Sequence, residues 1–150
     1  MAYKGTFQPK HAGKYRGDPS KIVYRSSWEL KLMMHLDSHP DVLEWASEEI
    51  VIPYRSPVDG KIHRYFPDFY VKKRNTSGDI EKVIIEVKPA HQVKVPTIQE
   101  TKNRKPSRKY INEVLTYTVN QAKWEAAKTY CLDRQWKFMI MTEKELGIKF

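Results

Sequence analysis

Two short segments decide the fold of this chain: RYFPDFYV at residues 64–71 and VIIEVKP at residues 83–89. Both are rich in aromatic and β-branched residues and have Pro or Gly nearby, which is the pattern of β-strands. Each also carries an acidic residue, Asp68 in the first and Glu86 in the second. An ionised carboxylate in an apolar strand is costly unless it is paired, hydrogen-bonded or bound to a metal ion. We therefore expect these strands to build a functional site as well as a core.

Length and composition bound the class of protein. The chain has 150 residues and a formal net charge of +9. We expect a single domain at residues 21–150, preceded by a basic arm at residues 1–20 that buries little. No apolar run reaches the roughly 18 residues that a membrane-spanning helix needs. The single cysteine, Cys131, excludes an internal disulfide. The strong positive charge favours nucleic acid as the partner.

The remaining strand patterns complete a sheet. A run at residues 42–54 predicts a bent or bulged strand, and a short apolar run at residues 136–141 predicts a last strand. Asp59-Gly60 is a strong hairpin signal, and the turn residues at positions 75–79 connect to the strand that holds Glu86. The strands before, between and after these two turns form a three-strand antiparallel meander.

Two segments show helical periodicity. The first begins at Ser26 and ends near residue 40, and the second runs from about Arg108 to Asp133 with a buried stripe that includes Ile111 and Leu115. The chain order is thus helix, three-strand meander, helix and strand. This order predicts an α/β fold in which a mixed sheet is flanked by helices.

Glu29, in the first helix, has two interpretations. Ser26 and Glu29 have the spacing of a capping box, in which the glutamate serves only the helix N-terminus. Glu29 is also in helical register with Leu32 and Leu36, so it points along the face that those residues bury. A carboxylate on a buried face needs a partner, and we expect Glu29 to join the site.

The spacing of Glu86 and Lys88 predicts a chemical site. Two residues apart on a strand, they project to one face, while Val87 faces the opposite layer. Asp68 and Glu86, with the carbonyl of Val87, can bind a hard divalent ion such as Mg²⁺ or Mn²⁺. Lys88 can then orient or deprotonate water, or stabilise a phosphate. The alternative is a simple Glu86–Lys88 salt bridge on a solvated sheet.

The order of Glu29, Pro67-Asp68 and Glu86-Val87-Lys88 resembles the PD-(D/E)xK nuclease superfamily. The segments RSSWE (25–29) and YFPDF (65–69) resemble its TnsA-type endonuclease branch. Longer stretches are similar to the head-completion nucleases of T-even-type tailed phages: YRGDPS (15–20), IPYRSPVD (52–59), HRYFPDFY (63–70) and VNQAKW (119–124).

This resemblance implies a restriction-endonuclease-like core and a role for each motif residue. Asp68 and Glu86 correspond to metal ligands, Glu29 to an additional ligand, and Lys88 to the catalytic lysine. Gln121 matches a helix glutamine that some branches place near the site, although a glutamine on a helix is more often a solvated or capping side chain.

The resemblance also implies a biological setting. It predicts a metal-dependent nuclease that trims or nicks packaged DNA at the portal of a filled phage head, so that head and tail can join. The expected partners are double-stranded DNA and the phage portal, head and neck proteins. The protein would act in the host cytoplasm during phage assembly, with retention in the head–neck region of the virion as a further option.

Basic residues surround the expected site and predict DNA binding through phosphates without sequence specificity. They are Arg16, Arg25, Arg55, Arg64, Lys94, Lys102, Arg104, Lys105 and Arg108. Two alternatives to the phage nuclease stay open from the sequence: a non-catalytic head plug or connector that binds the DNA end, and a repair or recombination nuclease of the same fold. The oligomeric state is not predicted.

Overall fold

The computed structural model describes residues 4–97 and 105–146. Its elements follow one another in this order: β1 (Gly5–Thr6), η1 (Ala12–Lys14), β2 (Val23–Tyr24), α1 (Ser27–Ser38), β3 (Val42–Ser47), β4 (Ile52–Arg55), β5 (Ile62–Tyr65), β6 (Phe69–Arg74), β7 (Ile80–Val87), α2 (Ala90–Val93), α3 (Arg108–Arg134), β8 (Lys137–Met141) and α4 (Glu143–Leu146). None of the described helices is long and apolar enough to cross a membrane.

A four-stranded sheet lies at the centre, in the order β3-β6-β7-β8. The strands β3, β6 and β7 pair antiparallel, and β8 pairs parallel with β7. The predicted mixed sheet with three antiparallel strands is therefore confirmed, but the predicted Asp59-Gly60 turn joins β4 to β5, outside this sheet. The turn between β6 and β7 has Gly78 at φ +85°, a left-handed conformation that glycine adopts without strain.

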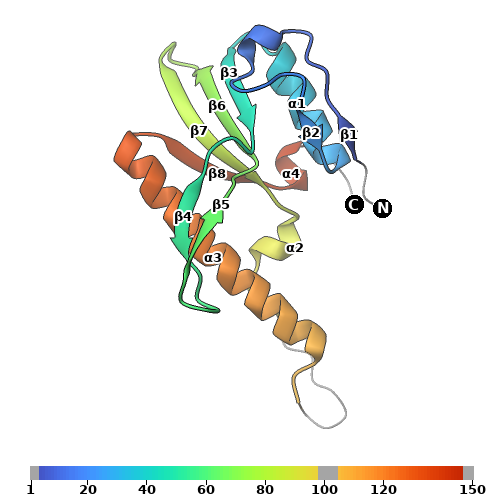
Figure 1. Cartoon of the computed structure of the whole chain (residues 1–150), viewed down its shortest axis with the longest axis vertical. Helices are drawn as coiled ribbons and strands as arrows, with labels where there is room; N and C mark the ends of the chain where they lie inside the picture. Colours follow the sequence, from blue (N-terminus) through green and yellow to red (C-terminus); the bar gives the residue numbers. More distant parts are fainter. Residues whose placement is uncertain (1–3, 98–104, 147–150) are drawn as a thin grey trace.

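Helices cover both faces of this sheet, with α1 on one side and the C-terminal part of α3 on the other (Figure 1). The strand alternation explains the two layers. Phe69 and Val71 of β6 pack with Leu32 and Met33 of α1, whereas Tyr70 packs with Cys131 of α3. The sheet is thus apolar on both faces, as expected for a sheet between two helical layers.

Two of the predicted strands are each divided into two. Residues 42–54 form β3 and β4, with Glu48 between them at φ +55°, and residues 64–71 are interrupted at Pro67. Proline lacks the N–H that a central strand donates. Among the residues that the structure describes, the extra strands β4 and β5 pair with each other and with no other strand, and their hairpin lies against α3 (Figure 1). The expectation that residues 42–54 form a single strand is wrong, because the chain leaves the central sheet at Glu48 and β4 pairs with β5.

The predicted helix ends are confirmed. The Ser26 hydroxyl accepts a hydrogen bond from the Glu29 N–H (3.1 Å), and Ser107 caps α3 through the Tyr110 N–H (3.0 Å). The predicted buried stripe of α3 is wrong at its N-terminal end, where Ile111 and Leu115 are 48% and 47% exposed. This half of the helix extends beyond the sheet (Figure 1), so it has no sheet surface to bury them.

The N-terminal segment is part of the core, and the expectation that it buries little is wrong. The rings of Phe7 and Tyr15 pack edge-on against Trp45, with centroid distances of 5.9 and 4.8 Å. The Asp37 carboxylate also accepts hydrogen bonds from the backbone N–H groups of Lys10 and His11. Aromatic packing and these bonds hold the basic segment on the sheet and α1.

Candidate active site

The strand register brings three acidic residues to one end of the sheet. Ser47 pairs with Phe69, and Phe69 pairs with Ile85. One residue further along, Glu48, Asp68 and Glu86 therefore occupy neighbouring positions. The Glu48 N–H donates to the Asp68 carbonyl (3.1 Å), which fixes the first of these neighbours. Like charges on adjacent strands are destabilising, so this arrangement favours binding of a cation.

Asp68 lies at the centre of this group. The Val87 N–H donates to Asp68 Oδ2 at 2.7 Å and orients the carboxylate. Burial raises the pKa of Asp68 well above its ordinary value, and the nearby charge of Glu86 raises it further, with a smaller contribution from Glu29. The surroundings of Asp68 thus disfavour its ionised form, and a divalent ion would stabilise the carboxylate.

Glu29 reaches the same group from α1. Its carboxylate accepts the Arg25 N–H (3.0 Å) and the Ser26 hydroxyl (3.3 Å), so Glu29 serves the helix N-terminus as predicted, although it accepts the N–H of Arg25 and not that of the N-cap Ser26. Glu29 is nonetheless only 9% exposed, and burial raises its pKa. Its carboxylate also lies beside Asp68, so the two interpretations of Glu29 are compatible.

Three carboxylates form what we call the acidic cluster: Glu29, Glu48 and Asp68. Each residue contributes one carboxylate oxygen, and these three oxygens all lie within 4.8 Å of one another. Oxygen ligands of Mg²⁺ or Ca²⁺ lie about 2.0–2.6 Å from the ion, so opposite ligands of one ion stand about 4–5 Å apart. The spacing and the chemistry of the acidic cluster therefore fit a hard divalent ion.

Glu86 is buried beside the acidic cluster and held by two groups. The Tyr65 hydroxyl donates to Glu86 Oε1 at 2.8 Å, and Lys88 Nζ lies 3.6 Å from Glu86 Oε2. Burial, reinforced by the Glu86 charge, raises the pKa of Tyr65, so the hydroxyl stays a donor. The Glu86–Lys88 ion pair exists, but Glu86 is 5% exposed, which does not match a bridge on a solvated sheet.

Glu48 is the acidic residue that the sequence interpretation missed. It forms an ion pair with the Arg25 guanidinium, whose pKa the Glu48 hydrogen bond and charge raise. The available signal was the pair Glu48-Glu49, which interrupts the apolar run between Ala46 and Ile50. Treating residues 42–54 as one strand concealed this break.

Two further predicted residues are Val87, whose carbonyl stays a predicted metal ligand, and Gln121. Val87 contributes its N–H to Asp68, and its side chain packs with the α1 layer. Gln121 is half-buried on α3, and within residues 4–97 and 105–146 no hydrogen bond or ion pair joins it to the acidic cluster. The neighbouring Asn120 is the more buried amide of α3.

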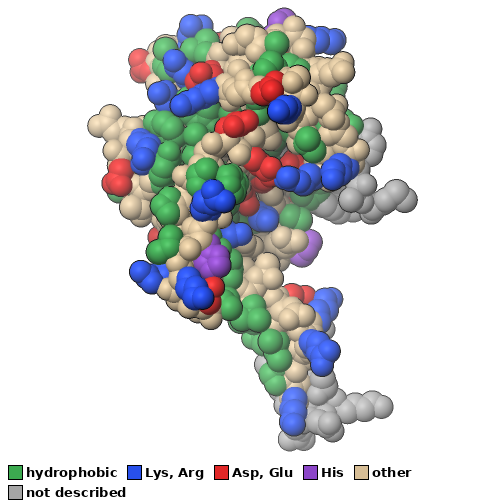
Figure 2. Space-filling model, in the orientation of Figure 1, with side chains coloured by type: hydrophobic (Ala, Val, Ile, Leu, Met, Phe, Trp, Pro, Cys, Tyr) green, Lys and Arg blue, Asp and Glu red, His purple; other side chains and the backbone are tan. Residues whose placement is uncertain are grey.

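The predicted DNA-binding residues lie at several places on the surface. Arg25 is at the acidic cluster, while the guanidinium of Arg16 lies 5.3 Å from the Tyr70 ring and that of Arg64 lies 5.7 Å from the Phe66 ring. Figure 2 shows acidic side chains near the middle of the visible face with basic ones beside them.

The other predicted DNA-binding residues lie further along the chain. Arg55 donates to the Gly60 carbonyl in the β4–β5 turn, and Lys94, Lys105 and Arg108 are exposed. Lys102 and Arg104 lie outside the described residues.

Known nucleases resemble this chain both in part and over its whole length. A family model described as "TnsA-like endonuclease N terminal" matches residues 39–143. The protein named "Head completion nuclease" of Enterobacteria phage T4 is 40% identical over 152 residues, which cover 99% of each chain. The range matched by the family model includes Glu48, Asp68, Glu86 and Lys88, and Glu29 precedes it.

Proposed function

Because the chain belongs to the TnsA-like endonucleases and is a phage head completion nuclease, we propose that it hydrolyses DNA phosphodiesters at the acidic cluster and Glu86 with the help of Mg²⁺ or Mn²⁺. The observation that carries this proposal is the row of Glu48, Asp68 and Glu86 at one end of the sheet, with Glu29 beside it. No other arrangement in the described chain gathers so many carboxylates around one point.

Glu29, Glu48, Asp68 and Glu86 are the residues that we propose to hold the ion. When bound, a divalent ion polarises a phosphoryl oxygen and lowers the pKa of a water molecule. The chain's contribution is a fixed set of oxygen ligands. Asp68 is oriented by the Val87 N–H and Glu86 by the Tyr65 hydroxyl, so little reorganisation is needed when the ion binds.

Lys88 is the residue that we propose to act on water and phosphate. Its ammonium group lies 3.6 Å from Glu86 and its side chain is 28% exposed, so it can reach a phosphate that lies over the carboxylates. There it can orient the attacking water or stabilise the negative charge of the transition state.

Arg25 is placed to help bind the substrate. Its guanidinium pairs with Glu48, and its side chain is 58% exposed. Since a planar guanidinium can donate two parallel hydrogen bonds to a phosphate, Arg25 can position the DNA backbone beside the acidic cluster.

The proposed substrate is double-stranded DNA, bound through its phosphates without sequence specificity. The exposed residues Arg16, Arg55, Arg64, Lys94, Lys105 and Arg108 support this binding mode, and Lys102 and Arg104 belong to the same proposal. In the phage, the enzyme would trim or nick packaged DNA at the portal before the head joins the tail. The head and neck proteins are the proposed partners, and the host cytoplasm and the virion neck the proposed locations.

A cleavage assay tests the proposal. Wild type, Asp68→Asn and Lys88→Met are incubated with closed circular, linear and single-stranded DNA in Mg²⁺, Mn²⁺ or EDTA, with Asp41→Asn as a matched control on the exposed surface. We expect the wild type and the control to nick circular DNA only with a divalent ion, and both site variants to lose at least about a hundredfold in rate. Equal cleavage by wild type and Asp68→Asn would refute the proposal. Cleavage of linear but not circular DNA would assign an exonuclease.

A further inference from the structure

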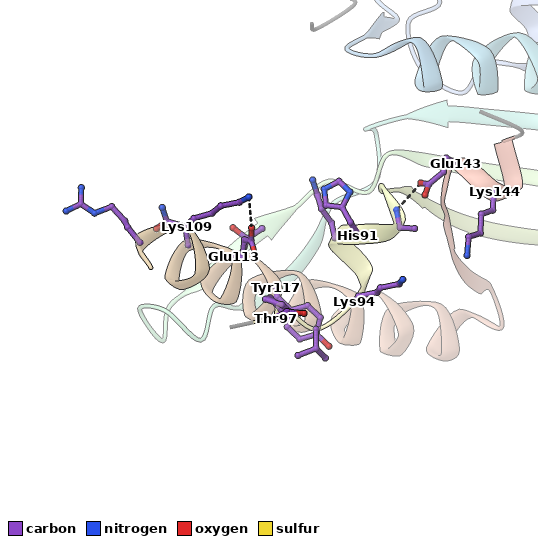
Figure 3. A pocket seen from close by; sticks show the side chains of 15 residues that line it. His91, Lys94, Thr97, Lys109, Glu113, Tyr117, Glu143 and Lys144 are labelled. Atoms are coloured by element: carbon purple, nitrogen blue, oxygen red, sulfur yellow. Dashed lines mark hydrogen bonds and ion pairs between the residues drawn. The ribbon is translucent and has the colours of Figure 1, made fainter. Parts of the chain in front are cut away.

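A groove opens between α2, the N-terminal part of α3 and α4 (Figure 3). Its volume is about 1160 Å³, and α2 begins at Ala90, two residues after Lys88. The groove therefore starts just after the proposed catalytic lysine, which directly follows β7. We propose that it binds a single-stranded segment of the DNA substrate, an inference that rests on the proposed function and specifies its substrate.

The charge of the groove fits a polyanion. Glu113 pairs with Lys109 (3.9 Å), and Glu143 accepts a hydrogen bond from the Ala90 N–H (2.9 Å), so both acids at its wall are engaged. Three cations at the wall form no ion pair with the residues that the structure describes: Lys94, Arg108 and Lys144. Such cations are available to successive phosphates of a strand.

The other wall residues suit unpaired bases. Tyr117 and His91 line the groove from α3 and α2 (Figure 3), and an aromatic ring in a basic groove is the usual platform on which an unpaired base stacks. Asn112 and Thr116 add hydrogen-bonding groups on the same side of α3. The groove wall thus offers a stacking ring beside polar groups on one side of α3.

The size of the groove favours a single strand over a duplex. Pockets of about 300–1,000 Å³ hold one drug-sized molecule, so a groove of about 1160 Å³ holds a few nucleotides. A duplex is too wide, because its major groove alone admits an α-helix. We therefore expect the enzyme to bind DNA most tightly when an unpaired stretch lies next to the cleaved duplex.

Strand binding can be measured without cleavage. The full chain is titrated in EDTA against a fluorescent ten-nucleotide oligothymidylate and against a blunt duplex of equal length, and binding is followed by anisotropy. The variants are Tyr117→Ala, Tyr117→Phe and Lys94→Ala. The matched controls are Tyr110→Ala, on α3 but outside the groove wall, and Lys31→Ala on α1.

We expect Tyr117→Ala to weaken binding of the single strand about 5- to 150-fold, the effect of losing one stacked base. Tyr117→Phe and both controls should stay within about twofold of the wild type, because they retain the stacking ring or leave the groove intact. Lys94→Ala should reduce the slope of log affinity against log salt by about 0.7, the value for one phosphate contact on a single strand. Duplex binding should change little in Tyr117→Ala and Tyr117→Phe.

Three results would overturn the inference: unchanged strand binding by Tyr117→Ala, equal losses for strand and duplex, or a loss in Tyr110→Ala as large as in Tyr117→Ala. The proposed function is judged separately by plasmid nicking. If the protein nicks DNA but Tyr117→Ala leaves strand binding unchanged, the proposed function stands and the groove does not bind the strand. If the protein binds the strand through Tyr117 but cleaves no DNA, strand binding in the groove stands and the proposed hydrolysis fails.

Discussion

The Tyr65 hydroxyl is the most informative single group to remove. Tyr65 is 4% exposed, and its hydroxyl donates to Glu86 Oε1 at 2.8 Å. In Tyr65→Phe the ring remains and only this donor is lost. A hydrogen bond to a charged group contributes about 1.5–3 kcal/mol, so the free energy of unfolding should fall by about that amount. At about 2–4 °C per kcal/mol for a chain of this size, the melting temperature should fall by about 3–12 °C.

The same substitution should weaken metal binding. Glu86 keeps its positively charged partner Lys88 at 3.6 Å but loses the group that orients its other oxygen. Loss of such an outer partner typically lowers metal affinity about 10- to 100-fold. Calorimetric titration with Mn²⁺ measures this affinity, and thermal unfolding in EDTA measures stability without the ion.

Tyr54→Phe is the matched control. Tyr54 is 9% exposed in the same core cluster, and the Lys123 ammonium lies 5.8 Å from its ring and 5.6 Å from that of Tyr65. Its hydroxyl makes no hydrogen bond within the described part of the chain. If Tyr65→Phe and Tyr54→Phe have the same melting temperature and the same Mn²⁺ affinity, Tyr65 does not position Glu86 and the reasoning fails.

Three further predictions concern other parts of the structure. Because the folded-state pKa of Asp68 is raised, the stability of the ion-free protein should fall as pH rises from about 4 through that pKa. Thermal melts in EDTA should show a smaller fall for Asp68→Asn, and equal pH dependence in both proteins would contradict the raised pKa of Asp68. Glu48→Gln should lower Mn²⁺ affinity at least about tenfold, whereas Glu49→Gln should leave it unchanged; similar affinities in both would remove Glu48 from the ligand set. Phe7→Ala should lower the free energy of unfolding in urea by about 3–5 kcal/mol, since its ring packs on Trp45; a loss below about 1 kcal/mol would show that the N-terminal segment adds little.

Local patterns were sufficient for several conclusions. Ser26 and Ser107 indicate the helix starts because a cap needs only its own helix turn, and both caps are present. The two-residue spacing of Glu86 and Lys88 places them on one side because a strand alternates its side chains. The motif residues indicated the nuclease family, which the family model and the phage relative confirm.

Other features depended on contacts between distant segments. The Glu48 position follows from the register of β3 on β6, and the burial of Phe7 from the position of Trp45, neither of which a local pattern contains. The exposure of Ile111 followed from where the sheet ends.

The amino-acid sequence by itself determined the two main helices, the strands of the central sheet and their order, because helix periodicity, strand alternation and capping act over a few residues. The family and the motif acids followed from the resemblance of the motifs to known nucleases. The tertiary structure alone decided that Glu48 joins Glu29 and Asp68, and that Tyr65 holds Glu86. These pairs are separated by about 20 residues, and only the packing of strands and helices brings them within bonding distance.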